Sequence, residues 1–325
     1  MKAIVYREYG SPDVLKLEEV EKPTPKDNEV LVKVHAASIN YADWVALTGK
    51  PLIGRMMIGG IQKPKHMILG YDVAGKVEAI GKDVRQFQPG DDVFGDISAQ
   101  GGGGLAEYVP VPEDKLVVKP ANVPYEEAAA VPLAGVTALQ GVRTKGQIKP
   151  GQKVLIVGAS GGVGMFAVQI AKALGAEVTA VCSAKKLDVV RSVGADHVVD
   201  YTKGNFFSSG QLYDLIIGAN GNYSLSEYKR ALTPNGTYVC TGGSLSQIFG
   251  SMLLGSVATL GSKKKIKNLA AMPSKSDLLF MKELLETGKV VPVIDKRYPL
   301  SESAEAYRYF GKGHTTGKVV ITVSA

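Results

Sequence analysis

A run of small residues near the middle of the chain has the composition and spacing of a phosphate-binding loop. It reads Gly158-Ala159-Ser160-Gly161-Gly162-Val163-Gly164, follows the apolar run Lys153–Val157, and precedes a helical pattern over Met165–Leu174. Small residues allow a tight turn and bring backbone N–H groups close to a pyrophosphate at a helix N-terminus. A lone glycine turn also occurs for packing alone, but here the flanking strand and helix favour a dinucleotide-binding loop.

The second expected strand, Glu177–Cys182, indicates which dinucleotide the loop serves. NAD-binding sites place an acidic residue at the end of this strand, roughly 20 residues after the loop. This chain instead has Ser183-Ala184-Lys185-Lys186, a hydroxyl followed by two ammonium groups. These groups suit a 2′-phosphate, so we expect NADPH as the cofactor. The alternative is an exposed basic start of a helix.

The pattern of apolar and polar residues predicts how the elements around this loop are organised. The first 120 or so residues contain short alternating strands and turns, such as Glu29–Ala36, whereas the chain after Lys149 alternates buried strands with helices. The last strand, Gly317–Val323, is expected to return to the first domain. We therefore predict an α/β protein: a doubly wound parallel Rossmann sheet inserted into a mostly β domain. The expected boundaries are 1–122, 123–264 and 265–325.

Composition excludes several classes of protein. The 325 residues include only two cysteines and carry a net charge of +7, with lysine and arginine scattered apart from Lys263–Lys265. We find no nucleic-acid-binding motif, and two distant cysteines fit a reducing compartment. The apolar stretch Ile248–Leu260 is too short to span a membrane. The N-terminus runs directly into a strand-like segment, so we expect a cytoplasmic protein.

The full order of features resembles the medium-chain dehydrogenase/reductase superfamily. Within it, the chain is most similar to the zinc-independent quinone oxidoreductases, including zeta-crystallin and the plant alkenal/enone reductases. The resemblance runs from Lys2 to Val323 and implies a GroES-like catalytic domain and a homodimer. It is carried by Glu29–Val34, Ala37–Asn40, Gly70–Gly75, Pro89–Asp91, Ala128–Ala130, the glycine loop and Leu174–Ala176.

The resemblance also implies that no catalytic zinc is bound. Zinc enzymes of the superfamily hold the metal with a Cys, a His and a further Cys or acidic residue. In this sequence the first two positions align with Asn40 and Tyr71, and the third falls near Leu133 and Ala134. The four-cysteine lobe of those enzymes is replaced by Gly101–Gly104. We therefore expect no metal ligands.

Site roles follow from the resemblance residue by residue. Asn40 is expected at the nicotinamide end, with Tyr41, Tyr71 or water as the proton donor. Many relatives carry a pocket Tyr five residues after the Asn, where this chain has Val45, and Tyr41 and Trp44 are candidates to replace it. The expected cofactor contacts are Asn40, Thr137, Ala159, Ser160, Gly161, Gly162, Val163, Ser183, Lys186, Tyr201, Asn220, Gly242, Gly243, Ser244, Thr316 and Lys318.

These expectations lead to one functional hypothesis and two rivals. Hydride addition to a conjugated carbonyl needs no Lewis acid, because the charge delocalises onto the carbonyl oxygen. We therefore expect an NADPH-dependent reductase of quinones or α,β-unsaturated carbonyl compounds. One rival is an enoyl-thioester reductase that uses Lys263–Lys267 to bind a pantetheine arm. The other is a non-catalytic NADPH-binding structural protein, or a weak RNA binder.

Overall fold

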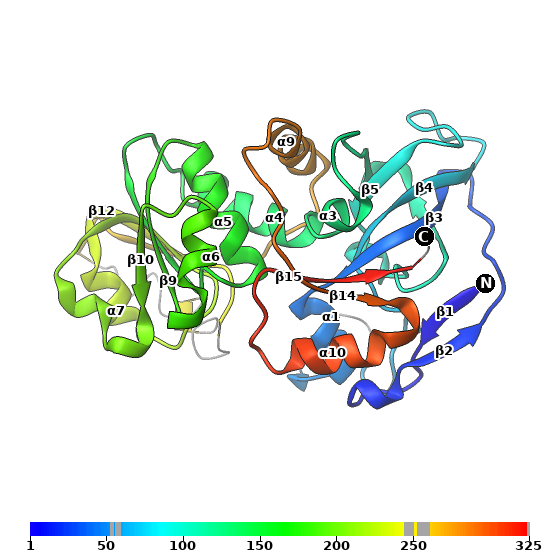
Figure 1. The fold of residues 1–325 in the computed structure, drawn as a ribbon, viewed down its shortest axis with the longest axis horizontal. Coiled ribbons are helices and arrows are strands. Elements are labelled where there is room, and N and C mark those ends of the chain that lie inside the picture. Colours follow the sequence, from blue (N-terminus) through cyan, green and yellow to red (C-terminus); the bar gives the residue numbers. More distant parts are fainter. Residues whose placement is uncertain (53–54, 56–59, 244–249, 252–260, 324–325) are drawn as a thin grey trace. The chain divides into compact units, whose positions relative to one another are not determined.

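The computed structural model describes residues 1–325 apart from 53–54, 56–59, 244–249, 252–260 and 324–325 (Figure 1). The chain forms two compact units. Unit 1 comprises Met1–Leu133, Pro273–Glu286 and Pro292–Ala325, and unit 2 comprises Ala134–Met272 and Thr287–Val291. Unit 2 is thus inserted into unit 1, and the expected fold class is confirmed. The expected boundaries, after residues 122 and 264, remain predictions.

Unit 1 is built on a mostly antiparallel sheet in which the last strand of the chain pairs with β3. Within the described residues the order is β14-β15-β3-β4-β5-β7, and β6 also pairs with β3. A separate hairpin joins β1 to β2. Strand β15 pairs antiparallel with β3, so the return of the chain to the first domain is confirmed. The strands are β1 (Lys2–Val5), β2 (Lys16–Glu19), β3 (Glu29–Ile39), β4 (Asp72–Ile80), β5 (Asp92–Asp96), β6 (Tyr108–Pro112), β7 (Leu116–Val118), β14 (Ile294–Pro299) and β15 (Lys318–Thr322).

Helices cover this sheet and close its core. Figure 1 shows α10 running beside β14 and β15, against which it packs. Nearly all side chains of β3 are buried, and valines of β3 and β4 such as Val32 and Val73 share one core cluster. A second cluster around Ile39, Leu47 and Tyr307 lies under α1 and α10. Among the described residues, the α-helices of this unit are α1 (Tyr41–Thr48), α3 (Tyr125–Ala129), α9 (Lys275–Glu286) and α10 (Ser303–Gly311).

Unit 2 is a parallel sheet in the Rossmann order. Its described strands run β10-β9-β8-β11-β12-β13, so in chain order the first strand is central and the fourth lies beside it. Residues Lys265–Asn268, expected to begin the return to the first domain, form the edge strand β13. The other strands are β8 (Lys153–Val157), β9 (Glu177–Cys182), β10 (His197–Asp200), β11 (Tyr213–Gly218) and β12 (Leu232–Cys240).

In the described part of unit 2 the crossover helices are α5 (Gly162–Ala173), α6 (Leu187–Ser192) and α7 (Leu225–Arg230), and α4 (Pro132–Leu139) leads into the unit. Register aligns the strand ends: Val157 is level with Val181 and Gly218, and Gly218 is level with Cys240. The carboxyl ends of β8, β9, β11 and β12 therefore form one edge, where open α/β sheets bind ligands. No helix among the described residues is long and apolar enough to cross a membrane.

Candidate active site

The glycine loop connects β8 to α5 and aims backbone N–H groups beyond the sheet edge. Gly161 is the N-terminal cap of α5, and the Met165 N–H donates the first helical hydrogen bond, to the Gly161 carbonyl. The amides of Gly162 and Val163 precede that bond, and such amides bind anions at helix N-termini. Other loop amides are already engaged: the N–H groups of Gly158 and Ala159 both donate to the Val181 carbonyl, and the Gly161 N–H donates to the Gly158 carbonyl. These bonds anchor the loop, and the N–H groups that begin α5 are the ones suited to bind an anion.

The steric surroundings of the loop glycines show which of them are needed for packing and which of them borders open space. Gly158 has a φ of +81°, and a Cβ there would lie 2.7 Å from the Asn220 backbone. A Cβ on Gly164 would collide with the Gly158 carbonyl and lie 2.7 Å from the Ala159 Cα. Around Gly161, in contrast, the nearest atom to an added Cβ is 3.6 Å away. The open space at Gly161 fits a dinucleotide pyrophosphate resting on this loop.

The residues predicted to select the 2′-phosphate gather at the ends of two neighbouring strands. Cys182 of β9 is level with Asp200 of β10, so Ser183 and Tyr201 follow from adjacent positions. Lys186 is half-buried and its N–H donates to the Ser183 carbonyl at 2.9 Å. Asp200, which sequence reasoning missed, accepts hydrogen bonds from Thr202, while its Oδ2 is buried and has no hydrogen-bond partner. This strand end thus holds a hydroxyl, an ammonium and a carboxylate.

Further predicted cofactor residues follow β11 and β12. The Asn220 N–H donates to the Val157 carbonyl at 3.2 Å, which brings Asn220 beside the glycine loop. The Gly242 N–H donates to the Gly218 carbonyl at 3.2 Å, and Gly243 has a φ of +118°. Thr137 is a buried residue of α4. Ser244 and most of Ile248–Leu260 lie outside the described residues.

The predicted residues in unit 1 meet in a buried polar cluster. The Asn40 Nδ2 donates to Asp72 Oδ2 at 2.8 Å, and the Lys318 Nζ donates to the Asn40 Oδ1. Lys318 also lies 3.4 Å from Asp72 Oδ2 and is only 3% exposed. Buried charges require partners. Lys318 therefore belongs to the surroundings of Asn40 and does not extend into solvent.

Two further carboxyl groups lie near this cluster. Asp43, which is fully buried, accepts hydrogen bonds from the Asn40 N–H at 2.9 Å and the Gly70 N–H at 3.1 Å. Burial, reinforced by repulsion from Asp72, raises the pKa of Asp43 to about 7. Burial likewise raises the pKa of Asp96 to about 6. Burial lowers the pKa of Lys318, and Asp72 opposes that shift.

Three other predicted residues of unit 1 have different surroundings. Tyr41 begins α1 and is 63% exposed, so its phenol is accessible. Tyr71 packs in the core with residues such as Leu105 and Tyr307, which favours a packing role. The Thr316 N–H donates to the Asp295 carboxylate at 3.0 Å. The indole of Trp44 packs beside Phe310 of α10.

Asp43 and Asp72 were not among the predicted residues, although a sequence pattern pointed to each of them. Asn40 and Asp43 have the spacing of a helix cap with a carboxylate three residues later. Asp72 sits in the Gly70–Gly75 segment, directly after Tyr71. In the described ranges no three His, Cys, Asp or Glu residues are grouped so as to hold a metal ion.

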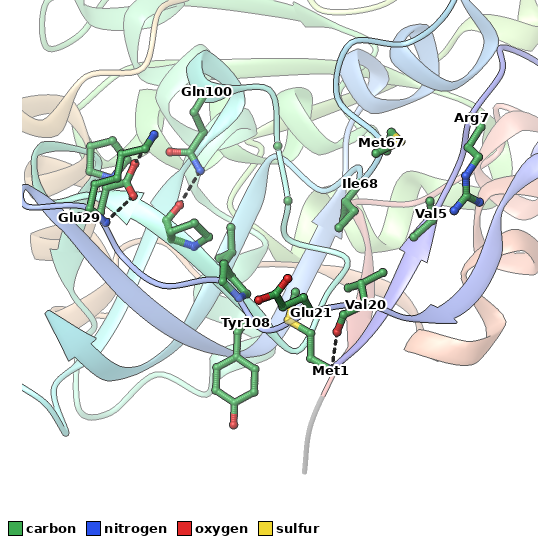
Figure 2. A pocket seen from close by; sticks show the side chains of 17 residues that line it. Met1, Val5, Arg7, Val20, Glu21, Glu29, Met67, Ile68, Gln100 and Tyr108 are labelled. Atoms are coloured by element: carbon green, nitrogen blue, oxygen red, sulfur yellow. Dashed lines mark hydrogen bonds and ion pairs between the residues drawn. The ribbon is translucent and has the colours of Figure 1, made fainter. Parts of the chain in front are cut away.

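A cavity of about 600 Å³ lies elsewhere in unit 1, beside the hairpin β1–β2 and β6 (Figure 2). Its wall is mainly apolar, with Val5, Ile68 and Val109 among the lining residues. Gln100 borders it and donates to the Pro110 carbonyl at 3.0 Å. None of the predicted site residues lines this cavity.

Two family models match the chain. Residues 26–121 match the alcohol dehydrogenase GroES-like domain, and residues 193–321 match the family described as zinc-binding dehydrogenase. The chloroplast envelope quinone oxidoreductase homolog of Arabidopsis thaliana is 37% identical over 334 residues, covering 99% of this chain and 98% of that protein. The chloroplastic NADPH-dependent alkenal/one oxidoreductase of Arabidopsis thaliana is 35% identical, covering 99% of this chain and 79% of that protein.

A solved structure agrees over the same length. The quinone oxidoreductase of Coxiella burnetii is 28% identical, with a TM-score of 0.89, and the match covers 100% of this chain and 99% of that one. The similarity is therefore to whole two-domain oxidoreductases and includes both units of this chain.

The loop geometry predicts opposite effects for two neighbouring glycines. Gly161→Ala should weaken NADPH binding and leave the melting temperature nearly unchanged, because the added Cβ enters open space. Gly164→Ala should destabilise the protein by about 1–3 kcal/mol, because overpacking forces the backbone to shift. Cofactor fluorescence titration and thermal unfolding measure the two effects. A Gly161→Ala protein with wild-type affinity would show that the open space does not hold the cofactor.

Asp43 predicts a pH dependence of stability. Its pKa rises from 3.8 in the unfolded chain to about 7 in the fold, so between these values the folded state holds a proton that the unfolded state has lost. Stability should therefore fall as the pH rises from about 4 to 7, by up to about 1.4 kcal/mol per pH unit from this group. Asp96 adds a smaller change of the same sign.

Denaturant unfolding of Asp43→Asn at several pH values between 4 and 8 measures this contribution. The variant should show a shallower decline than the wild type. Asp188→Asn, which changes an exposed carboxylate, serves as the matched control and should keep the wild-type slope. Parallel curves for wild type and Asp43→Asn would contradict the assignment.

Proposed function

Because this chain belongs to the quinone oxidoreductase-like branch of the medium-chain dehydrogenase/reductase superfamily, we propose that it reduces quinones or α,β-unsaturated carbonyl compounds with NADPH and without zinc. The chain is an NAD(P)H-dependent oxidoreductase. The choice of acceptor rests on relatives whose names refer to quinones and to alkenals and enones.

The contact between Lys318 and Asn40 is the observation that carries this proposal. Asn40 stands where zinc enzymes of the superfamily have their first ligand. Its amide oxygen accepts a hydrogen bond from a buried ammonium, and its amide nitrogen donates to Asp72. A cation at this place repels a second cation, and an engaged amide is a poor zinc ligand. Tyr71, at the second ligand position, is packed in the core.

Without a metal, the chemistry must suit a substrate that stabilises its own developing charge. A conjugated carbonyl or a quinone does so, because the added electron pair delocalises onto oxygen, whereas an alkoxide would need a Lewis acid. When bound, the reduced nicotinamide supplies a hydride, which is a proton and two electrons. One further proton then completes the reduction of the acceptor.

The chain's own residues bind the cofactor, orient the reactants and hold that further proton. The N-terminal amides of α5 provide an anion site, and Ser183 and Lys186 are proposed to bind the 2′-phosphate. Asn40 is held in one orientation within unit 1. The exposed phenol of Tyr41 is the more accessible of the two tyrosine donors, and water is the alternative.

The rival of an enoyl-thioester reductase has less support from unit 2. Lys264 Nζ donates to the Lys229 carbonyl at 2.8 Å, and Lys267 Nζ donates to the Lys145 carbonyl at 2.7 Å. These ammonium groups are anchored on their own unit, which does not favour a basic channel for a pantetheine arm. A homodimer joined through sheet edges such as β13, and a cytoplasmic location, also remain proposals.

Turnover with a panel of acceptors tests the proposed function. Purified protein treated with a chelator should oxidise NADPH in the presence of quinones or enones, and added zinc should not increase the rate. Simple alcohols with NADP⁺ should give no comparable rate. Tight NADPH binding without turnover on any acceptor would favour the non-catalytic rival, and loss of activity on chelation would contradict zinc independence.

The end of β9 predicts the cofactor preference. Lys186→Glu should lower kcat/KM for NADPH by about 10- to 100-fold, because a charge-assisted bond is replaced by repulsion, and should leave NADH turnover similar. Lys185→Glu makes the same charge change at an exposed neighbour and should have a much smaller effect. Steady-state kinetics with both cofactors measures the ratio. Equal losses in the two variants would show that only the general charge of this surface matters.

A further inference from the structure

The side-chain amide of Asn40 is engaged on both sides. Its Nδ2 donates to Asp72 Oδ2 at 2.8 Å, and its Oδ1 accepts from the Lys318 ammonium. The second hydrogen of Nδ2 has only a long contact of 3.5 Å, with the Ser38 carbonyl. The amide thus lies between a pure acceptor and a pure donor.

This arrangement permits one orientation of the amide. Rotating the amide by 180° would place its NH₂ group against the ammonium of Lys318 and its oxygen against the carboxylate of Asp72. Both contacts would then be repulsive, and buried polar groups would lose their partners. Asn40 is 5% exposed, so water offers little compensation.

Asp72 is itself fixed by further hydrogen bonds. Its Oδ2 also accepts from the Ser38 hydroxyl at 2.8 Å, and its Oδ1 accepts from the Leu133 N–H at 2.8 Å. These partners come from β3 and from the start of α4, while Lys318 opens β15. The carboxylate therefore cannot turn to follow a rotating Asn40.

We propose that Lys318 and Asp72 are positioning residues that together fix the orientation of the Asn40 amide for hydride transfer. The functional part of this inference rests on the proposed function, in which Asn40 lies at the nicotinamide end of the site. A buried ion pair is a weak source of stability, since neutral replacements of similar shape often stabilise as well. We therefore assign the Lys318–Asp72 pair the role of orienting the Asn40 amide that lies between them.

The decisive variant is Lys318→Met combined with Asp72→Asn. Lys318→Met alone leaves the buried Asp72 carboxylate without a positive partner, so the melting temperature of this variant should fall. The double variant removes both charges and should recover much of that loss. Its amide at position 72 accepts either orientation of Asn40, so kcat should stay about 10- to 100-fold below wild type. Lys296→Met, at an exposed lysine on the neighbouring strand β14, is the matched control and should retain wild-type kcat.

Asn40→Ala shows whether the pair acts through Asn40. Adding the two charge-removing substitutions to Asn40→Ala should lower kcat little further, because the group that they orient is already absent. A double variant with wild-type kcat would overturn the inference. So would a double substitution that lowers kcat by the same factor in the Asn40→Ala background as in the wild type. This comparison still decides the question if Lys318→Met alone does not fold.

A readout without turnover keeps this inference separate from the proposed function. With ¹⁵N-labelled asparagine, the Asn40 side chain of the wild type should give one pair of slowly exchanging amide signals. In the double variant these signals should exchange faster or split. Unchanged signals would overturn the fixed orientation, whereas a wild type that reduces no acceptor would overturn only the proposed function.

Discussion

The carboxylate of Asp72 is the constraint on which unit 1 depends. It is fully buried and accepts hydrogen bonds from Ser38, Asn40, Leu133 and Lys318, so its two oxygens join β3, β4, β15 and the start of α4. Strand β15 comes from the far end of the chain, after the whole of unit 2. A buried carboxylate needs its partners, and Lys318 of β15 is one of them, so the cluster is complete only when β15 has paired with the sheet.

The two units prepare their sites by different physical means. Unit 2 uses backbone: amides at the start of α5 form an anion site, and glycines at positions 158 and 164 permit the close packing that the loop requires. Unit 1 uses side chains whose hydrogen-bond partners are all internal. Backbone N–H groups donate to any suitably placed phosphate, whereas the orientation of a side-chain amide decides on which side it presents its donor and on which its acceptor.

Features that depend on local pattern could be predicted from the sequence. The glycine loop between a buried strand and a helix predicted the Rossmann sheet, and the alternation of apolar and polar residues over 317–323 predicted the returning strand. The surroundings of Asn40 could not be predicted, because Asp72 and Lys318 are 32 and 278 residues away and meet only through strand pairing. The burial of Lys318 could not be predicted either, because composition does not reveal that a lysine is buried; its expected contact with the cofactor stays a prediction.

The charge balance of the cluster explains why one ammonium suffices. Asp43, Asp72 and Asp96 are all buried, and three ionised carboxylates beside a single Lys318 would leave two negative charges uncompensated. Burial raises the pKa of Asp43 to about 7 and that of Asp96 to about 6, so each carboxyl group keeps its proton to a higher pH than an exposed aspartate does. Asp72 is the carboxylate that contacts the ammonium, and it also accepts hydrogen bonds from Ser38, Asn40 and Leu133. One ammonium and the raised pKa values of Asp43 and Asp96 together limit the negative charge that the fold must hold in this cluster.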